Sequence, residues 1–307
     1  MTDVPWDYDA FLDDLVAWAE RREDVLAAVV LGSRARDADR PADEWSDLDC
    51  LLVTTDPDGY LADADWLADL GDAWLTFRES TATGDLTERR ALFAPGLDVD
   101  FVPVSADSLE AVAAAGSDVL ARGYRVVYDE TDVRTALADA VAASQTCDAA
   151  TDNFSDDGAA TEKREAYPLP SAEEFRERRA DCWYHAVWTA KKLRRGEVWT
   201  AKSCLDGYLK RECLLPMLGW HTRARHGREP WYEGRFLEEW ADDRALADLR
   251  GTFADYDAED CWRALFETTD CFEWVADEVA DELGYDPDLR GERRSRDLLA
   301  ELYDGRE

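Results

Sequence analysis

Two aspartates one residue apart, Asp47 and Asp49, lie in the stretch LGSRARDADRPADEWSDLDCLLV, which runs from Leu31 to Val53. The apolar residues that follow them predict a β-strand. Residues i and i+2 of a strand point to the same face, with their Cα atoms roughly 6.5–7 Å apart. Two carboxylates placed in this way suit a divalent cation such as magnesium, which prefers oxygen ligands. The alternative is a solvated pair of charges on the surface of an acidic protein.

The residues before this pair favour the first interpretation. VLAAVVL, residues 25–31, predicts a short buried strand that stops at Gly32 and Ser33. Glycine lets a phosphate group approach the backbone closely, and exposed amides of such a turn attract anions. A phosphate-binding turn beside two metal-binding carboxylates is typical of enzymes that transfer phosphoryl or nucleotidyl groups.

A second pair of alternating aspartates, Asp98 and Asp100, lies in LDVDFVPV, residues 97–104. The apolar residues between and after them predict a strand with one buried face, so both carboxylates would project from the other face. We therefore expect a neighbouring strand to supply the third carboxylate of a metal site that Asp47 and Asp49 begin.

The elements that must position these residues form a mixed α/β unit around a small sheet, followed by a helical bundle. Ser171 and Glu174 form a capping-box pattern that begins the helical part. We predict a catalytic α/β domain over 1–141, a linker or active-site loop over 142–170, and an all-α domain over 171–307. The segments with strand or helix periodicity are 7–22 (helix), 25–31, 48–53, 74–80 and 89–104 (strands), then 171–195, 200–218 and 257–283 (helices).

The composition is that of a folded but extremely acidic protein. The formal net charge is −35, while 46% of the residues are hydrophobic and 13 are tryptophan, which argues against disorder. Lysine and isoleucine are scarce or absent, and we interpret this composition as that of a salt-loving organism, since molar salt shortens the Debye length to about 3 Å. The charge argues against nonspecific binding of nucleic acid, which requires a basic surface.

The cysteine spacing and the hydropathy pattern predict the compartment in which the protein works. None of the seven cysteines lies in a CxxC pair, and no apolar run approaches the roughly 18 residues of a membrane span. We expect a reduced cytoplasmic protein with free thiols, without a structural zinc site and without membrane partners.

The motif series GSRARD…SDLDCLLV…LDVDFVPV resembles the signature of the nucleotidyltransferase superfamily. From about residue 7 to 303 the chain is similar to the aminoglycoside 6-adenylyltransferases, also called streptomycin adenylyltransferases. The helical half carries this resemblance too, in CWYHAVWTAKKLRRGEVWTAKSCLDGYLKRECLLPMLGWHT and YDAEDCWRALFETTDCFEWVADEVADELGYDPD.

The resemblance implies that AMP is transferred from ATP to a hydroxyl group of a small acceptor, with two magnesium ions as cofactor. Asp47 and Asp49 match the metal-binding pair of the family. The third acid of the family lies five residues before a proline, which selects Asp98, before Pro103. Asp100 stands where the family has an uncharged residue, so the identity of the general base, Asp98 or Asp100, stays open.

The same resemblance assigns the nucleotide contacts. Gly32 and Ser33 match the turn that meets the triphosphate, Arg34 follows it, and Lys202 is placed like a lysine of the family. We expect these residues to bind the phosphates and an aminoglycoside such as streptomycin to be the acceptor. Lys191 and its basic neighbours are expected to complement the dipole at a helix C-terminus. Two alternatives remain: modification of a protein or a tRNA, or a nucleotide-binding protein without activity.

Overall fold

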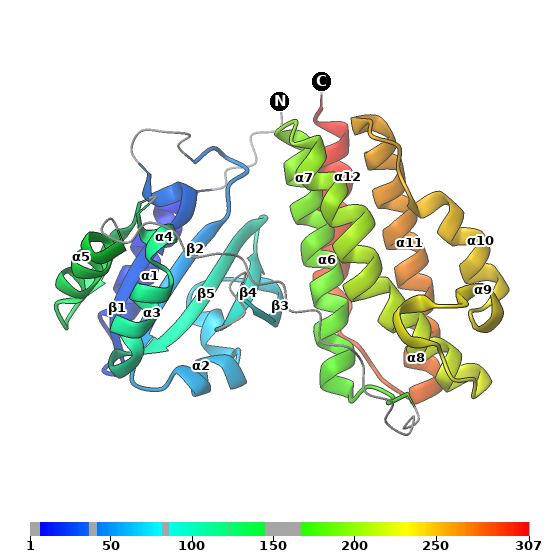
Figure 1. Ribbon diagram of the computed structural model, residues 1–307, viewed down its shortest axis with the longest axis horizontal. Coiled ribbons are helices and arrows are strands. Elements are labelled where there is room, and N and C mark those ends of the chain that lie inside the picture. The colour runs from blue at the N-terminus through cyan, green and yellow to red at the C-terminus, as the bar shows by residue number, and fades with distance from the viewer. Residues whose placement is uncertain (1–6, 37–41, 82–85, 122, 145–166, 307) are drawn as a thin grey trace.

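The computed structural model describes residues 7–36, 42–81, 86–121, 123–144 and 167–306. Figure 1 shows two parts side by side, a sheet with helices on both faces and a group of long helices. The fold predicted from the sequence, a small mixed sheet followed by a helical bundle, is confirmed. The domain boundaries remain predictions, and most of the predicted linker, residues 145–166, lies outside the described residues.

The sheet has six strands in the order β3-β4-β5-β2-β1-β6. Only β2 and β5 are parallel; every other neighbouring pair is antiparallel. The strands are β1 (Val25–Leu31), β2 (Leu48–Thr54), β3 (Ala73–Ser80), β4 (Thr87–Phe93), β5 (Leu97–Ser105) and β6 (Arg125–Asp129).

One face of the sheet is covered by the first helices of the chain. Leu15 and Trp18 of α1 (Tyr8–Ala19) pack with Trp66 against apolar side chains of β2, β4 and β5. On the opposite face, Leu109 and Leu137 pack against β1 and β2. The helices and short turns of this half are α1, α2 (Pro57–Ala62), η2 (Asp65–Asp69), η3 (Ala106–Ser108), α3 (Leu109–Ala115), α4 (Ser117–Leu120) and α5 (Val133–Ser144).

The helical half packs against the remaining part of that second face. Leu75 and Phe77 of β3 and Leu92 of β4 belong to the same core as the long helices, in which α6 contains Trp183 and Tyr184. The helical elements are α6 (Ala172–Arg194), α7 (Val198–Ser203), the π-helix η4 (Cys204–Leu214), α8 (Leu215–His226), η5 (Tyr232–Gly234), α9 (Leu237–Trp240), α10 (Asp243–Thr252), α11 (Ala258–Leu283) and α12 (Arg290–Asp304).

Local signals explain where these helices begin and end. The side chain of Ser171 accepts a hydrogen bond from the amide of Glu174, whose carboxylate accepts one from the amide of Ser171, so the predicted capping box is present. Asp257 caps α11, and Gly284 ends it with a left-handed backbone (φ 70°). The strand β6 was not predicted, because its five residues carry too short a pattern.

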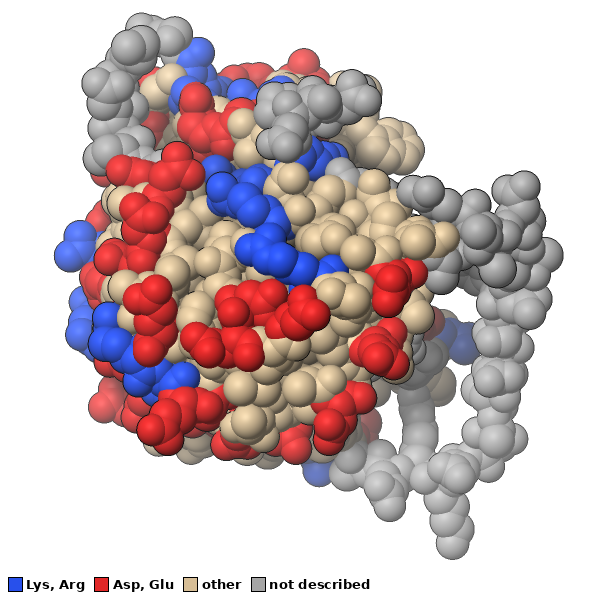
Figure 2. Space-filling model, turned by 90° about the vertical axis from the view of Figure 1, so that its left-hand side faces the viewer, with Lys and Arg blue, Asp and Glu red and all other residues tan. Residues whose placement is uncertain are grey.

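The surface reflects the composition. Acidic side chains are spread over the face at the α5 end of the molecule, with fewer basic side chains among them (Figure 2). Among the described residues, no helix is long and apolar enough to cross a membrane.

Gly291, at the start of α12, tests the contact between the two halves. A Cβ atom there would lie 1.9 Å from the carbonyl oxygen of Trp74 in β3. Because backbone cannot yield as a flexible side chain does, Gly291→Ala should lower the free energy of unfolding by about 2 kcal/mol or more in urea titrations. Gly207→Ala is the control: in the described part of the chain, no atom beyond its chain neighbours and the adjacent backbone of its own helix lies within 4 Å of the added Cβ. This variant should be neutral or slightly stabilising. Equal stability of the two variants would contradict the packing of α12 on β3.

Candidate active site

The register of the sheet brings the two aspartate pairs together. Asp49 of β2 is the cross-strand neighbour of Asp100 in β5, and the two strands run in the same direction. Neighbouring strands lie about 4.8 Å apart, and paired residues project from the same face. Asp98, two residues before Asp100, shares this face, and Asp47 immediately precedes β2. We call Asp47, Asp49, Asp98 and Asp100 the acid cluster.

The cluster lies on the face of the sheet between two hydrophobic cores. Leu51 and Val53, which follow Asp49 on its face, pack under α3 and α5. Leu92, the cross-strand neighbour of Asp98, packs against the helical half. The acids therefore occupy the polar strip that separates the two cores.

Gly32 and Ser33 lie directly beside this strip. Leu31, the last residue of β1, is the cross-strand neighbour of Asp49. Gly32 has a positive φ of 67°, and a Cβ atom there would lie 2.2 Å from Oδ2 of Asp49, so only glycine fits. The hydroxyl of Ser33 is buried and has no hydrogen-bond partner among the described residues. An unused donor at this position is available to a ligand oxygen.

Arg34 holds the loop that leads to the aspartates. Its guanidinium donates to the carbonyl oxygens of Ser46 (2.6 Å) and Asp47 (3.1 Å), and it stacks on the ring of Tyr8. From the other side, Arg195 at the end of α6 pairs with Asp43 at 2.9 Å. Because these donors are used within the protein, the structure gives Arg34 a positioning role in the free chain.

Asp98 is held by two partners from outside the sheet. Lys191 of α6 is wholly buried, and its ammonium donates to Oδ1 of Asp98 and, at 2.7 Å, to the carbonyl oxygen of Gly96. The hydroxyl of Tyr8 donates to the same Oδ1 at 2.7 Å. Burial raises the pKa of Asp98, but the charge and hydrogen bonds of Lys191 outweigh it, and the net pKa is lowered.

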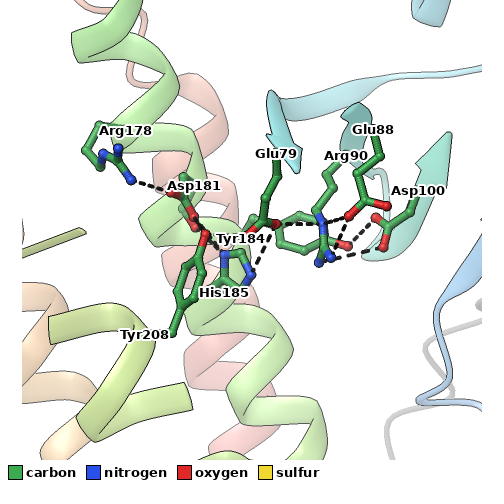
Figure 3. A network of polar contacts seen from close by, with 9 residues as sticks. All are labelled: Glu79, Glu88, Arg90, Asp100, Arg178, Asp181, Tyr184, His185 and Tyr208. Atoms are coloured by element: carbon green, nitrogen blue, oxygen red, sulfur yellow. Dashed lines mark hydrogen bonds and ion pairs between the residues drawn. The ribbon is translucent and has the colours of Figure 1, made fainter. Parts of the chain in front are cut away.

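Asp100 joins a polar network that crosses into the helical half (Figure 3). Tyr184 of α6 donates to Oδ1 of Asp100 at 2.7 Å, and Arg90, its neighbour on β4, lies 3.6 Å from Oδ2. Arg90 also pairs with Glu79 (2.9 Å) and Glu88 (2.7 Å). Arg90 is thus shared by Asp100 and two other carboxylates.

The network continues along α6. Glu79 accepts a hydrogen bond from Tyr208 at 2.6 Å and lies 3.8 Å from Nε2 of His185. Nδ1 of His185 contacts Asp181 at 2.8 Å, and Arg178 donates to the other oxygen of Asp181 at 2.9 Å. Figure 3 shows these side chains as one continuous chain of contacts from β5 to the far side of α6.

Two acids of the cluster are strained electrostatically. Burial raises the pKa of Asp49 to about 7, and the charges of Asp47 and Glu88 add to the shift. Burial also raises the pKa of Asp100 well above its ordinary value; Arg90 opposes this, while Asp49 and Glu88 reinforce it. The cluster therefore has more negative charge than its protein partners neutralise, which a bound cation would relieve.

The carboxylates of Asp47 and Asp49 are the ones left available. In the described part of the chain neither carboxylate makes a hydrogen bond or an ion pair, while Asp98 and Asp100 have partners. As the described side chains stand, no three histidine, cysteine or acidic groups are gathered closely enough to hold a metal ion. A magnesium ion bound by one or two carboxylates together with substrate phosphates fits this arrangement.

The basic residues are placed differently from expectation. The contacts of Lys202 lie within the helical half, to Asp206 and the carbonyl oxygen of Ala254, so its phosphate-binding role stays a prediction. Lys191, expected to complement the helix dipole, is instead the buried partner of Asp98. The i, i+7 spacing of Tyr184 and Lys191 was the available signal, since it places both on one face of a helix.

Nearly the whole chain is similar to known proteins. The profile of the family described as Streptomycin adenylyltransferase matches residues 7–302. An aminoglycoside 6-adenyltransferase from Bacillus subtilis is similar at 16% identity and a TM-score of 0.40, over 95% of this chain and 97% of that one. A nucleotidyltransferase-like protein from Exiguobacterium sibiricum is 12% identical, with a TM-score of 0.24 over 97% and 89% of the two chains. No curated protein sequence matches significantly.

The strain at Asp49 predicts an unusual pH dependence of stability. Because its pKa is higher in the folded chain, about 7, than the ordinary 3.8, the metal-free protein loses stability as pH rises from about 4 to 7. Asp49→Asn should remove the contribution of Asp49 to this loss, while that of Asp100 remains, and should raise the free energy of unfolding by about 1–3 kcal/mol at pH 8 in EDTA. Urea titrations at about pH 5 and pH 8 measure the difference.

A control separates this effect from the general acidity of the chain. Asp58 is an exposed residue of α2 outside the acid cluster, and Asp58→Asn should keep the pH dependence of the wild type. If Asp49→Asn loses as much free energy of unfolding between about pH 5 and pH 8 as the wild type, the pKa of Asp49 is not raised in the folded protein.

Proposed function

Since the chain belongs to the streptomycin adenylyltransferase family and is therefore a nucleotidyltransferase, we propose that it transfers AMP from ATP to a hydroxyl group of an aminoglycoside such as streptomycin. The observation that supports this most is the cross-strand pairing of Asp49 with Asp100. It places Asp49 and Asp100 side by side, with Asp98 on the same face of the sheet, next to a glycine turn that has an unused buried hydroxyl.

Asp47 and Asp49, with Asp98, are the residues we propose to hold magnesium, two ions in the full complex. Their oxygens are the hard ligands that this cation prefers. When bound, the cation would neutralise charge on the triphosphate and polarise the α-phosphate. The raised pKa of Asp49 supports the assignment, because a group that is costly to ionise alone gains most from a cation.

The chain's own residues would orient the triphosphate. Gly32 permits close approach of the backbone, and the hydroxyl of Ser33 is free to donate. Arg34 fixes the loop before Asp47 through the backbone carbonyls it binds. We keep Lys202 as a proposed phosphate contact, which requires that it leave Asp206.

We propose Asp100 as the general base and Asp98 as the ligand. A base works best when its pKa lies near the operating pH, and the pKa of Asp100 is raised while that of Asp98 is lowered by Lys191. The acceptor oxygen bonds to the α-phosphorus, the bond from that phosphorus to pyrophosphate breaks, and the hydroxyl proton passes to the carboxylate. Orientation of the reactants would supply most of the acceleration.

A polycationic acceptor suits the charge of this region. In the network of Figure 3 the carboxylates outnumber the permanently charged cations: the acids are Glu79, Glu88, Asp100 and Asp181, and the guanidinium groups are Arg90 and Arg178. The net charge of −35 also favours cationic ligands over a nucleic acid. We therefore rank a protein or tRNA acceptor second, after an aminoglycoside. The same experiment tests both.

The activity is tested with α-labelled ATP, magnesium and a panel of aminoglycosides at low and high salt. We expect label on an aminoglycoside, no transfer in EDTA, and a loss of about 100-fold or more in Asp49→Asn, with Asp58→Asn unchanged. Label on protein or tRNA alone would support the second candidate. Nucleotide binding without transfer to any acceptor would mark a catalytically inactive protein.

The roles of the two strand acids are separated by pH–rate profiles. Asp100→Asn should lower kcat by about 10²–10⁴-fold and remove the rise of the rate on the acidic side of the profile. Asp98→Asn should raise the magnesium concentration needed for half-maximal rate, while the rise of the rate on the acidic side of the profile remains. The reverse pattern would assign the base to Asp98.

A further inference from the structure

A separate pocket of about 530 Å³ lies in the helical half, bounded by the π-helix η4, α8, α9, α10 and the turns beside them. None of its lining residues belongs to the sheet or to the acid cluster. Its volume lies within the range of small-ligand sites, about 300–1,000 Å³.

Most of the wall is apolar. Phe253, at the rim, is 53% exposed, so the pocket is open to solvent on this side. Elsewhere the wall is built from aliphatic side chains of η4, α8, α9 and α10, namely Leu214, Leu215, Leu218, Leu237 and Leu249. A ligand here would bury an apolar body.

The charged residues of the wall are paired, with one exception. Asp206 pairs with Lys202, and Arg211 pairs with Glu233 at 3.1 Å. Lys210 has no ion pair within 4.0 Å among the residues that the structure describes. Its ammonium donates instead to two neutral oxygens, the carbonyl of Leu205 (3.0 Å) and the hydroxyl of Thr268 (2.8 Å).

The position of Lys210 makes this ammonium poorly solvated. The residue is only 8% exposed, and the ring of Phe253 lies 5.4 Å from Nζ. Burial lowers its pKa to about 8, against the opposing charge of Asp206. A third N–H of the ammonium group has no partner in the described chain, so an anion at the pocket wall would satisfy a donor and a charge together.

We infer that this pocket binds a small amphipathic carboxylate, with its anionic group on Lys210 and its apolar body between the leucines and Phe253. A single ammonium group without an ion pair among the described residues, that of Lys210, and an apolar wall match a ligand with one negative charge. A phosphate would need more hydrogen-bond donors than Lys210 supplies. The inference does not depend on the proposed function, because it uses no residue of the acid cluster.

The test compares ligands that differ only in charge. The probes are 2-naphthoate, the neutral 2-naphthalenemethanol and the cationic 2-naphthylmethylamine, and affinity is measured by calorimetry on the full chain in low and high salt. We expect the carboxylate to bind at least about tenfold more tightly than the alcohol or the amine. Equal affinities, or no binding at millimolar concentration, would overturn the proposal.

Variants locate the site. Lys210→Met should weaken 2-naphthoate binding by about tenfold or more and leave the affinity for the alcohol unchanged. Arg211 lies at the same wall but is already paired with Glu233, so Arg211→Gln should change the affinity for 2-naphthoate less than about threefold. Phe253 is half exposed, so Phe253→Ala should not disturb folding. This variant should weaken the binding of both 2-naphthoate and the alcohol. Unchanged binding in Lys210→Met and Phe253→Ala would exclude this pocket.

Discussion

The ion pair between Asp98 and the buried ammonium of Lys191 joins the sheet to the helical half at the point where the acids converge. Lys191 is wholly buried, so removing either partner would leave a charge without a counter-ion in a medium of low dielectric constant, which costs about 3–5 kcal/mol. Tyr184, two turns earlier on the same face of α6, binds Asp100 in the same way. The long helix therefore sets the position of both β5 acids, and the sheet alone would not.

Asp49 and Asp100 are electrostatically unfavourable neighbours. Asp49 and Asp100 are neighbours across parallel strands, and their pKa values are raised because burial and mutual repulsion oppose ionisation. A fold selected for stability alone would avoid such a pair. Its presence beside Gly32 and the unused hydroxyl of Ser33 is understandable if the charge serves a cation and a phosphate chain during turnover.

Lys191 and Lys210 show how similar side chains acquire different roles through their surroundings. Both are buried in the helical half, and burial lowers the pKa of each. Lys191 has a carboxylate as partner, whereas Lys210 has two neutral oxygens and an apolar pocket. The first holds Asp98 of the acid cluster in place, and the second is the cation that we propose binds a ligand.

The sequence by itself determined most of the strands, the capped long helices and the two aspartate pairs, because each depends on periodicity and on contacts a few residues apart; β6 was too short to be recognised. It also determined the family, since the motifs extend over nearly the whole chain. Only the tertiary structure decided that Asp49 faces Asp100, that Arg34 binds the loop backbone, that Lys202 contacts the helical half, and that Lys191 and Tyr184 reach the acids. Most of these contacts join residues that lie far apart along the chain. The packing of α6 against β3 and β4 brings Lys191 and Tyr184 to the acids, and strand pairing brings Asp49 to Asp100, which no local pattern records.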